Sequence, residues 1–400
     1  MRLINTQTYE LRQFFNNDTP KYAILSHTWE EEEVLFHHMN NIARSTQNKL
    51  GFKKVQGACS LAQSQGYEWI WIDTCCIDKS NSAELSEAIN SMFQYYQEAE
   101  VCYVYLKDVT RRNPKGIFET EFRCSKWFTR GWTLQELIAP ARVEFYTALW
   151  SKIGLKMEDS LSVLISEITG IDLQTLKGGN VLSVSIARRM YWASKRKTSR
   201  VEDRAYSLLG LFDVSMPMIY GEGIKAFRRL QEEILKSTDD QSIFAWHSPE
   251  YSEGTVVDVF ASSPSDFVGS GAIAREPFHR VRGKPTTITN QGVIIELPIM
   301  SVTRLGTTEF KLYDEVHAIL DCQIGSAPGT FPMIRLRSLH ATTQDGPKHY
   351  FRVMTGESIP TFGYFDRQSA ITDAPVIGLD PTQLHVDAYK EILGEAYYPR

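Results

Sequence analysis

YAILSHTW, residues 22–29, decides the fold class, because an apolar run of strand length ends there in polar side chains. The next run of this kind is Trp69–Asp73, and between the two runs Phe52–Gln65 repeats its apolar residues at helical spacing. A strand, a helix and a strand in this order predict a right-handed crossover between parallel strands. We therefore expect an α/β sheet whose carboxyl edge, where such sheets bind ligands, carries the polar end of this stretch.

The alternation of helices and strands continues to about residue 150. Its clearest helix has apolar residues on one face, and Asn81 or Ser82 is placed to cap the first turn. The pattern predicts a parallel sheet flanked by helices over residues 1–150. The further elements predicted in this part are a helix at 85–96, a strand at 101–106, a helix at 132–138 and a strand at 143–146.

The rest of the chain changes its pattern twice. Residues 151–246 are predicted to be mostly helical, and Ser199 with Glu202 has the spacing of a capping box. Residues 247–400 hold short β-type runs between turn-forming residues, which predicts a smaller, largely antiparallel β module. Three parts are thus expected: an α/β domain, a helical extension and a β-rich C-terminal domain.

The composition is that of an ordinary globular protein. The chain has 400 residues, 42% of them hydrophobic, and a net charge of −5, so no global positive field favours nucleic acid as a partner. The N-terminus lacks the apolar run of a signal peptide, and no stretch approaches the ~20 apolar residues that span a bilayer. The cysteines show neither CxxC pairs nor disulfide spacing. These features predict a cytoplasmic protein with mostly buried, reduced cysteines.

Three polar motifs carry the candidate chemistry, and the first is Ser26-His27-Thr28-Trp29. A hydroxyl and an imidazole at the end of a strand lie where α/β proteins bind ligands. The alternative is structural: Ser26 caps the following turn and His27 is a surface residue, since turns are rich in such side chains.

The second motif, WIDTCCIDK, follows the second strand with the carboxylates of Asp73 and Asp78 and two adjacent thiols. Such groups suit acid–base, nucleophilic or metal-binding roles. Zinc is disfavoured, because adjacent cysteines do not readily chelate one ion and no second pair is near. Cys75 as a nucleophile would need a base, for which His27 is the candidate. The alternative is a helix-capping turn with buried thiols.

The third motif, RGWTLQEL, places Glu136 in a short and otherwise apolar helix. Trp132 and its apolar neighbours account for the packing, so Glu136 is an acid expected in or near the core. Charged residues are rarely buried unless they are paired or functional. An ion pair with Arg130 is the structural alternative to a functional role.

Two further features have ordinary explanations. Tyr220–Gly223 holds a GxG sequence at a helix start, but no strand precedes it, so a helix-entry turn is predicted. Arg188–Arg204 is rich in arginine and lysine with acids interspersed, which predicts a solvated helical face rather than a nucleic-acid site.

Taken in order, YAILSHTW, EVLF, WIDTCCIDK and RGWTLQEL resemble the HET domain of fungal heterokaryon-incompatibility proteins. Residues 189–246 are similar to the segment that follows HET domains in many such proteins, so the resemblance covers roughly residues 1–246. The chain departs from the family pattern at Glu30, where the family usually has glycine. Glycine permits positive φ, so Glu30 predicts a different loop geometry and weaker or altered ligand binding.

The resemblance implies an effector of fungal non-self recognition and regulated cell death, a form of innate immunity, activated by self-association or by a sensor partner. HET domains also resemble TIR domains, which implies a TIR-like or flavodoxin-like parallel sheet. In catalytic TIR domains a glutamate that follows a tryptophan cleaves the nicotinamide–ribose bond of NAD, and Glu136 is the matching residue. NAD would then be the substrate, with no metal and no resident cofactor.

The chemistry implied for Glu136 is stabilisation of an oxocarbenium-like ribose by its carboxylate. Trp29 or Trp132 can stack on a ring, and other polar side chains can contact ribose or phosphate. The residues expected to bind the substrate are Ser26, His27, Trp29, Asp73, Cys75, Asp78, Arg130 and Trp132.

Two other functions stay open. One is a non-enzymatic module that assembles with itself or with a partner, in which the same motifs hold a fold or an interface. The other is a hydrolase that uses Cys75 or Ser26, although neither a GxSxG elbow nor a family-specific cysteine signature is present.

Overall fold

The chain forms two compact units in a computed structural model. Unit 1 comprises Met1–Leu182 and Lys195–Ala226, and unit 2 comprises Ser183–Ser194 and Phe227–Arg400. This partition assigns much of the expected helical extension to the same unit as the α/β sheet, and the three-part division predicted from the sequence stays a prediction. The residues that the structure describes are 1–15, 18–39, 42, 44–110, 117–275, 285–290, 292–301, 315–325, 329–338, 349–356, 358–359, 361–363 and 372–378.

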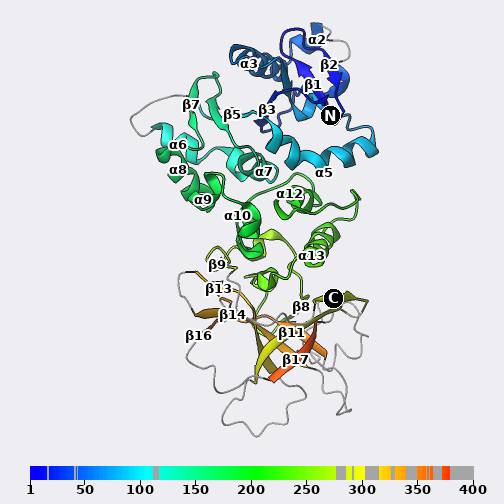
Figure 1. The fold of residues 1–400 in the computed structure, drawn as a ribbon, viewed down its shortest axis with the longest axis vertical. Coiled ribbons are helices and arrows are strands. Elements are labelled where there is room, and N and C mark those ends of the chain that lie inside the picture. The colour runs from blue at the N-terminus through cyan, green and yellow to red at the C-terminus, as the bar shows by residue number, and fades with distance from the viewer. Residues whose placement is uncertain are drawn as a thin grey trace. The chain divides into compact units, whose positions relative to one another are not determined.

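Unit 1 is built on a seven-stranded sheet of order β2-β1-β4-β3-β5-β6-β7 (Figure 1). Its centre is parallel, and the four parallel strands lie in the order second, first, third, fourth along the chain. Antiparallel strands flank this centre on both sides. The strands are β1 (Arg2–Asn5), β2 (Leu11–Gln13), β3 (Tyr22–His27), β4 (Trp69–Trp71), β5 (Val101–Leu106), β6 (Val143–Thr147) and β7 (Lys152–Leu155).

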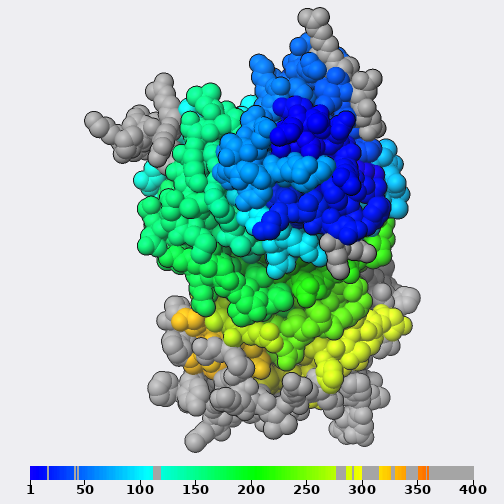
Figure 2. All heavy atoms as spheres, turned by 45° about the horizontal axis from the view of Figure 1, so that its top comes forward, coloured from blue at the N-terminus to red at the C-terminus, as the bar shows by residue number. Residues whose placement is uncertain are grey.

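Helices cover both faces of the parallel centre. Helix α3 (Leu50–Ser64) contacts one face, and α5 (Ser82–Glu98) with α7 (Thr133–Ile138) covers the other (Figure 1). Asn81 caps α5 by accepting hydrogen bonds from two backbone N–H groups of its first turn, as its position predicts. Every residue of β3 is buried, and the space-filling view shows the N-terminal segments, in blue, packed against those that follow in cyan and green (Figure 2).

The remaining helices of unit 1 are short, apart from α8. They are α1 (Phe36–Met39), α2 (Arg44–Gln47), α4 (Asp73–Cys76), α6 (Ile117–Arg123), the 3-10 helix η2 (Lys126–Thr129), α8 (Asp159–Thr169), α9 (Leu173–Leu176), α11 (Asp203–Tyr206) and α12 (Leu209–Phe212).

The sequence predicts the parallel strands and their crossover helices correctly, with ends that shift by a few residues. Among the strands, the largest shift is in the second, which stops at Trp71 because Asp73 already begins α4. The antiparallel strands β1, β2 and β7 were not predicted. They are three or four residues long and partly exposed, so they carry neither a long apolar run nor a clear alternation.

Unit 2 carries the β-rich part. Its main sheet has eight strands in the order β16-β14-β12-β11-β17-β15-β8, with β10 paired to β11, and every pairing is antiparallel except β15 with β17. This confirms a largely antiparallel β part. The strands are β8 (Val256–Val257), β9 (Ile273–Ala274), β10 (Thr287–Thr289), β11 (Gly292–Ser301), β12 (Glu315–Ile319), β13 (Gln323–Ile324), β14 (Thr330–Ser338), β15 (His349–Val353), β16 (Thr361–Gly363) and β17 (Thr372–Gly378).

Helical segments precede and accompany these strands. They are the 3-10 helix η3 (Val181–Ser183), α10 (Ile186–Ser194), α13 (Lys225–Ser237), and the 3-10 helices η4 (Gln241–Phe244) and η5 (Pro264–Phe267). Within the described part of the chain, no helix combines the length and the apolar character needed to cross a membrane.

Candidate functional site

Two polar clusters flank the carboxyl end of β3. Ser26 and His27 are its last two residues, and successive side chains of a strand point to opposite faces. Ser26 therefore meets Glu136 of α7 on one face, while His27 meets Lys54 of α3 on the other. Asp73 follows β4 directly and meets His27. The first, second and third motifs thus come together, but as two clusters rather than as one.

The first, here called the Glu136 cluster, comprises Ser26, Tyr96, Trp127, Glu136 and Arg196. The Ser26 hydroxyl donates a hydrogen bond to the Glu136 carboxyl and accepts one from the Trp127 indole, with 2.8 Å between Nε1 and Oγ. The Tyr96 hydroxyl lies 3.1 Å from the Leu25 carbonyl and also bonds the carboxyl. Glu136 is 7% exposed, so these neighbours nearly enclose it.

Burial governs the protonation of Glu136. Loss of water raises its pKa to about 8, and the negative charge of Asp73 acts in the same direction. The hydrogen bonds from Ser26 and Tyr96 and the positive charge of Arg196 act against this rise. The side chain is therefore mostly a neutral acid at neutral pH and becomes a carboxylate just above it.

Arg196 reaches this cluster from a segment far along the chain. Backbone hydrogen bonds clamp the segment to the start of α7: Lys197 N donates to Thr129 O over 2.7 Å, and Gly131 N donates to Lys197 O over 2.9 Å. A Cβ on Gly131 would lie 2.5 Å from the Thr198 side chain, so this close approach requires glycine. The clamp holds the Arg196 guanidinium beside α7.

The guanidinium of Arg196 bonds the helix that carries Glu136. Its Nη1 donates to Arg130 O and to Thr133 Oγ1, both over 2.9 Å. Burial lowers the pKa of Arg196 to about 9 against the opposing effect of Glu136, so the group stays cationic at neutral pH. A positive charge near a buried acid favours the carboxylate form of that acid.

Lys156 fixes the other end of α7. Its ammonium is buried and donates to Leu137 O over 3.0 Å and to Pro140 O over 2.8 Å. The last carbonyls of a helix have no partner within the helix, and they carry its negative partial charge. Lys156 therefore satisfies the carbonyl end of α7, while Arg196 bonds the Arg130 carbonyl and the Thr133 hydroxyl at its beginning.

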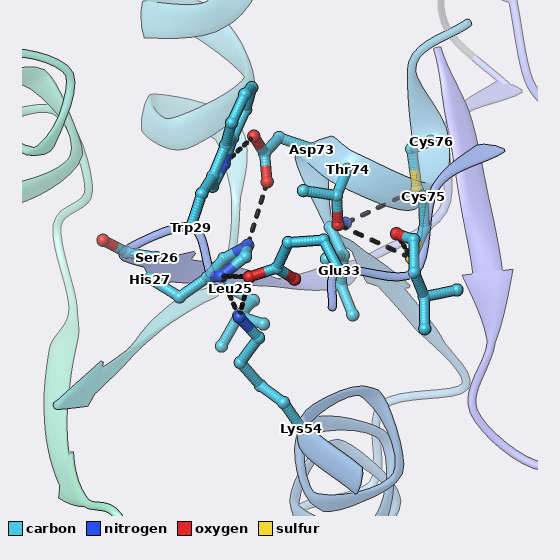
Figure 3. A network of polar contacts seen from close by, with 12 residues as sticks. Leu25, Ser26, His27, Trp29, Glu33, Lys54, Asp73, Thr74, Cys75 and Cys76 are labelled. Atoms are coloured by element: carbon cyan, nitrogen blue, oxygen red, sulfur yellow. Dashed lines mark hydrogen bonds and ion pairs between the residues drawn. The ribbon is translucent and has the colours of Figure 1, made fainter. Parts of the chain in front are cut away.

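The second cluster, here called the His27 cluster, comprises His27, Trp29, Glu33, Lys54 and Asp73 (Figure 3). The Lys54 ammonium lies 2.6 Å from His27 Nδ1 and 2.5 Å from Glu33 Oε1. An ammonium can only donate, so Nδ1 accepts and the N–H of His27 is on Nε2. Nε2 then donates to Asp73 Oδ1 over 3.0 Å. Both imidazole nitrogens are engaged, which leaves His27 as a positioning group rather than a free base.

Asp73 connects this cluster to the surface. Its Oδ2 accepts the Trp29 indole N–H over 2.8 Å, so each carboxylate oxygen has a donor. Burial opposes ionisation, but the hydrogen bond from His27 and the charge of Lys79 outweigh it and hold the pKa of Asp73 well below its usual range. Lys79 lies against the other side of Trp29, with Nζ 3.4 Å from the ring centroid.

Glu30 does not strain its loop. It does not lie among the described residues with positive φ, and its N–H donates to Glu33 Oε1 over 2.8 Å. Its carboxylate pairs with Lys107 over 2.6 Å. The loop thus accommodates glutamate by ordinary backbone geometry and an ion pair on the surface.

Four of the predicted site residues point elsewhere. Cys75 is buried with its thiol on Val34 O, and burial raises the pKa of that thiol well above its usual range, which disfavours a thiolate nucleophile. Asp78 accepts from the backbone and hydroxyl of Ser80 in a local turn. The other two are Arg130 and Trp132.

Arg130 and Trp132 contact the segment after residue 195. The Arg130 guanidinium donates to Ser199 Oγ over 3.0 Å, so the ion pair predicted between Arg130 and Glu136 is replaced by the contacts of Arg196. The Trp132 indole bonds the carboxylate of Asp203, which also accepts from the Tyr220 hydroxyl. Trp132 therefore ties α7 to this segment.

One sequence prediction for this segment is wrong, and another is correct only in part. Ser199 and Glu202 form no capping box at α11: Ser199 bonds Arg130, and the Glu202 carboxylate instead accepts the N–H groups of Gly221 and Gly223. The basic stretch is a solvated face only in part: Lys195, Lys197, Arg200 and Arg204 are exposed, whereas Arg189 is buried and the Arg196 guanidinium bonds the start of α7. The predicted helix-entry turn is present, with positive φ at both glycines before α13 begins.

The sequence analysis missed Lys54, Lys79, Lys156 and Arg196. A signal existed for Lys54, since it lies on the same helical face as Ala58 and other buried residues. The remaining lysines and Arg196 carry no such pattern. Among the residues that the structure describes, no group of three or more His, Cys, Asp or Glu could hold a metal ion, and all six cysteines are free.

Comparisons with known proteins agree with the motifs. Residues 22–117 match the family described as heterokaryon incompatibility protein (HET), and residues 225–331 match a domain of unknown function named DUF8212. The vegetative incompatibility protein HET-E-1 of Podospora anserina is 50% identical over 224 residues, which are 54% of this chain and 16% of that protein. No solved structure matches the chain. The HET match takes in β3, β4 and β5 and the residues of the His27 cluster, and these findings identify a HET domain within residues 22–117 of the chain.

Proposed function

We propose that unit 1 is an effector of fungal vegetative incompatibility and regulated cell death, and that it acts by cleaving the nicotinamide–ribose bond of NAD. The HET match and the similarity to a vegetative incompatibility protein support the biological role. One observation carries the chemistry: the Glu136 carboxyl is desolvated and bonded to Ser26 at the carboxyl end of a parallel strand.

The sheet topology supports a TIR-like assignment. Strand order second, first, third, fourth in the parallel centre is the beginning of the flavodoxin-like order, in which ligands bind where the chain switches direction across the sheet. Here the switch lies between β3 and β5, and Ser26 is on β3. The antiparallel flanks differ from that pattern, so the support comes from the centre of the sheet.

The proposed reaction is hydrolysis of NAD to ADP-ribose and nicotinamide. The bond between ribose C1′ and the pyridinium nitrogen breaks, and nicotinamide leaves as a neutral base with the electron pair. Water then adds to C1′ and releases a proton. The Glu136 carboxylate stabilises the positive charge that develops on the ribose, while Ser26 orients the carboxylate. Because the leaving group is neutral, no strong general acid is needed.

The enclosure of Glu136 makes the proposed effector latent. A side chain that is 7% exposed cannot touch a dinucleotide until a neighbouring segment moves. The same enclosure keeps the acid mostly neutral, with a pKa of about 8. Self-association or a sensor partner would open the cluster, admit the substrate and favour the carboxylate. Activity is therefore expected to depend on protein concentration or on enforced clustering.

The test is NAD consumption by the purified full chain, alone and clustered through a fused oligomerisation tag. Glu136→Gln keeps the size of the side chain and removes its charge, and Glu87→Gln on the exposed side of α5 is the matched control. Loss of cleavage in Glu136→Gln alone supports the proposal. Cleavage that persists in this variant refutes the role of Glu136.

The same enclosure favours one alternative, a non-enzymatic signalling module. In that case Glu136, Ser26 and Trp127 serve only to lock α7 against β3. Clustered wild-type protein would then consume no NAD, while death signalling in cells would still be lost on disruption of α7. This outcome would replace the catalytic proposal and leave the role in incompatibility intact.

A further inference from the structure

The ammonium of Lys79 is in an unusual environment. Its Nζ atom is shielded from solvent and has no hydrogen-bond acceptor among the residues that the structure describes. Its contact is the face of the Trp29 ring, 3.4 Å from the centroid. Burial lowers the pKa of Lys79, against the effect of the Asp73 charge. A buried cation whose N–H donors are unused has much to gain from an anionic oxygen.

The Trp29 ring is fixed and yet open. Lys79 covers one face, and the indole N–H is bound to Asp73, which His27 holds in turn. Nevertheless Trp29 is 54% exposed, so much of the surface that Lys79 and Asp73 leave uncovered meets solvent. A flat aromatic surface that is held in place is a stacking platform for another ring, because every nucleobase has a matching π face.

The acids nearby already accept hydrogen bonds from other groups. Both oxygens of Asp73 accept hydrogen bonds from His27 and Trp29. Glu33 accepts from Lys54 and from the N–H of Glu30. None of these acids takes a hydrogen bond from Lys79, so its donors remain available for the oxygen of an anion.

We infer that Trp29 and Lys79 form a binding site for an adenine nucleotide, with the base stacked on the open face of Trp29 and the phosphates bound by the ammonium of Lys79. Lysine is a common phosphate ligand and acts as a mobile point charge. Because Nζ lies beneath the ring, phosphate binding draws it toward the ring edge. The site requires no bond cleavage; only its assignment to the ADP part of NAD rests on the proposed function.

The test measures binding of ADP, pyrophosphate and adenosine to the full chain by isothermal titration calorimetry. ADP carries both the ring and the charge, and the other two probes carry one each. Lys79→Met removes the charge but keeps the stem, and it is expected to weaken ADP and pyrophosphate about tenfold or more. Trp29→Leu is expected to weaken ADP about fivefold or more and to leave pyrophosphate within about twofold.

Two further variants control for indirect effects. Trp29→Phe keeps a ring and should recover most of the ADP affinity that Trp29→Leu loses. Lys53→Met removes one exposed positive charge from α3 and should leave all three affinities within about twofold. If Lys53→Met weakens ADP as much as Lys79→Met does, the effect is general electrostatics and the inference is overturned.

The result can be separated from the fate of the proposed function. No ADP binding to the wild-type chain at about 1 mM overturns the inference. Equal ADP affinity in Lys79→Met and wild type also overturns it. If ADP binds with the expected pattern while clustered protein leaves NAD intact, the catalytic proposal fails and the nucleotide site stands.

Discussion

Glu136→Gln is predicted to change how the stability of the chain depends on pH. Burial raises the pKa of Glu136 from 4.5 to about 8, so the folded chain keeps a proton that the unfolded chain releases. The neutral side chain thus contributes stability that is complete below pH 4.5 and is lost as the pH rises through about 8. A tenfold change in proton affinity corresponds to ~1.4 kcal/mol, which gives a loss of about 5 kcal/mol over this range. Glutamine cannot ionise and escapes the loss.

The assay is urea unfolding of both full-length chains at several pH values, followed by tryptophan fluorescence. Other titrating groups are shared by the two chains, so the difference in the free energy of unfolding isolates Glu136. The free energy of unfolding of Glu136→Gln, relative to that of the wild type, is expected to rise by ~1.4 kcal/mol for each pH unit between about 5 and 8. Glu87→Gln, at an exposed position of α5, should shift it by less than about 0.5 kcal/mol.

A difference that stays flat from about pH 5 to about pH 8 would refute the reasoning, because Glu136 would then ionise in the folded chain as easily as in the unfolded one. Glu136 would then not be a desolvated acid in the folded chain. A shift of the opposite sign would mean that the hydrogen bonds and the charge of Arg196 affect the pKa of Glu136 more than burial does.

Three further predictions concern the groups that hold the two clusters. Lys54→Met leaves Glu33 buried without its partner and should cost about 3 kcal/mol or more of unfolding free energy, whereas Lys53→Met should cost less than about 0.5 kcal/mol; equal costs in urea unfolding would contradict this. Lys156→Met removes two hydrogen bonds to the end of α7 and should reduce the free energy of unfolding by about 2 kcal/mol, seen as a lower melting temperature. An unchanged melting temperature would exclude a capping role for Lys156. Arg196→Met should raise the pH range in which Glu136→Gln becomes more stable than the chain with Glu136, because it removes a positive charge that favours the carboxylate. An unchanged pH range would show that Arg196 does not act on Glu136.

Much of the fold could be predicted because its signals are local. The parallel strands are short apolar runs, and the crossover helices show helical spacing and, at Asn81, a cap. The edge strands β2 and β7 could not be predicted from the sequence, because an exposed strand of three or four residues needs no apolar pattern. The end of β4 shifted for a local reason as well: the helical turn at Asp73 begins before the apolar run is over.

The candidate site was predictable only in part. The motifs identify Ser26, His27 and Asp73 as polar residues at strand ends, and Glu136 as an acid in an otherwise apolar helix. What they cannot reveal is which face each side chain occupies, since a one-residue step along β3 separates Ser26 from His27 by the thickness of the sheet. Partners from distant segments are also invisible, which is why Arg130 was the expected partner of Glu136.

The connection between Glu136 and Arg196 extends the site beyond the residues that match the HET family. That match ends at residue 117, whereas α7 begins at Thr133 and its start is held by a segment after residue 195. Through this segment the indole of Trp132 is tied to Asp203. Any movement of the segment must therefore alter the hydrogen bonds at the start of α7 and the electrostatic surroundings of Glu136 together. An activating partner that displaces it would loosen the enclosure and remove a positive charge at once. Burial is the larger effect on Glu136, so the readmitted water would favour the carboxylate, and the positive pyridinium of NAD would act in the same direction.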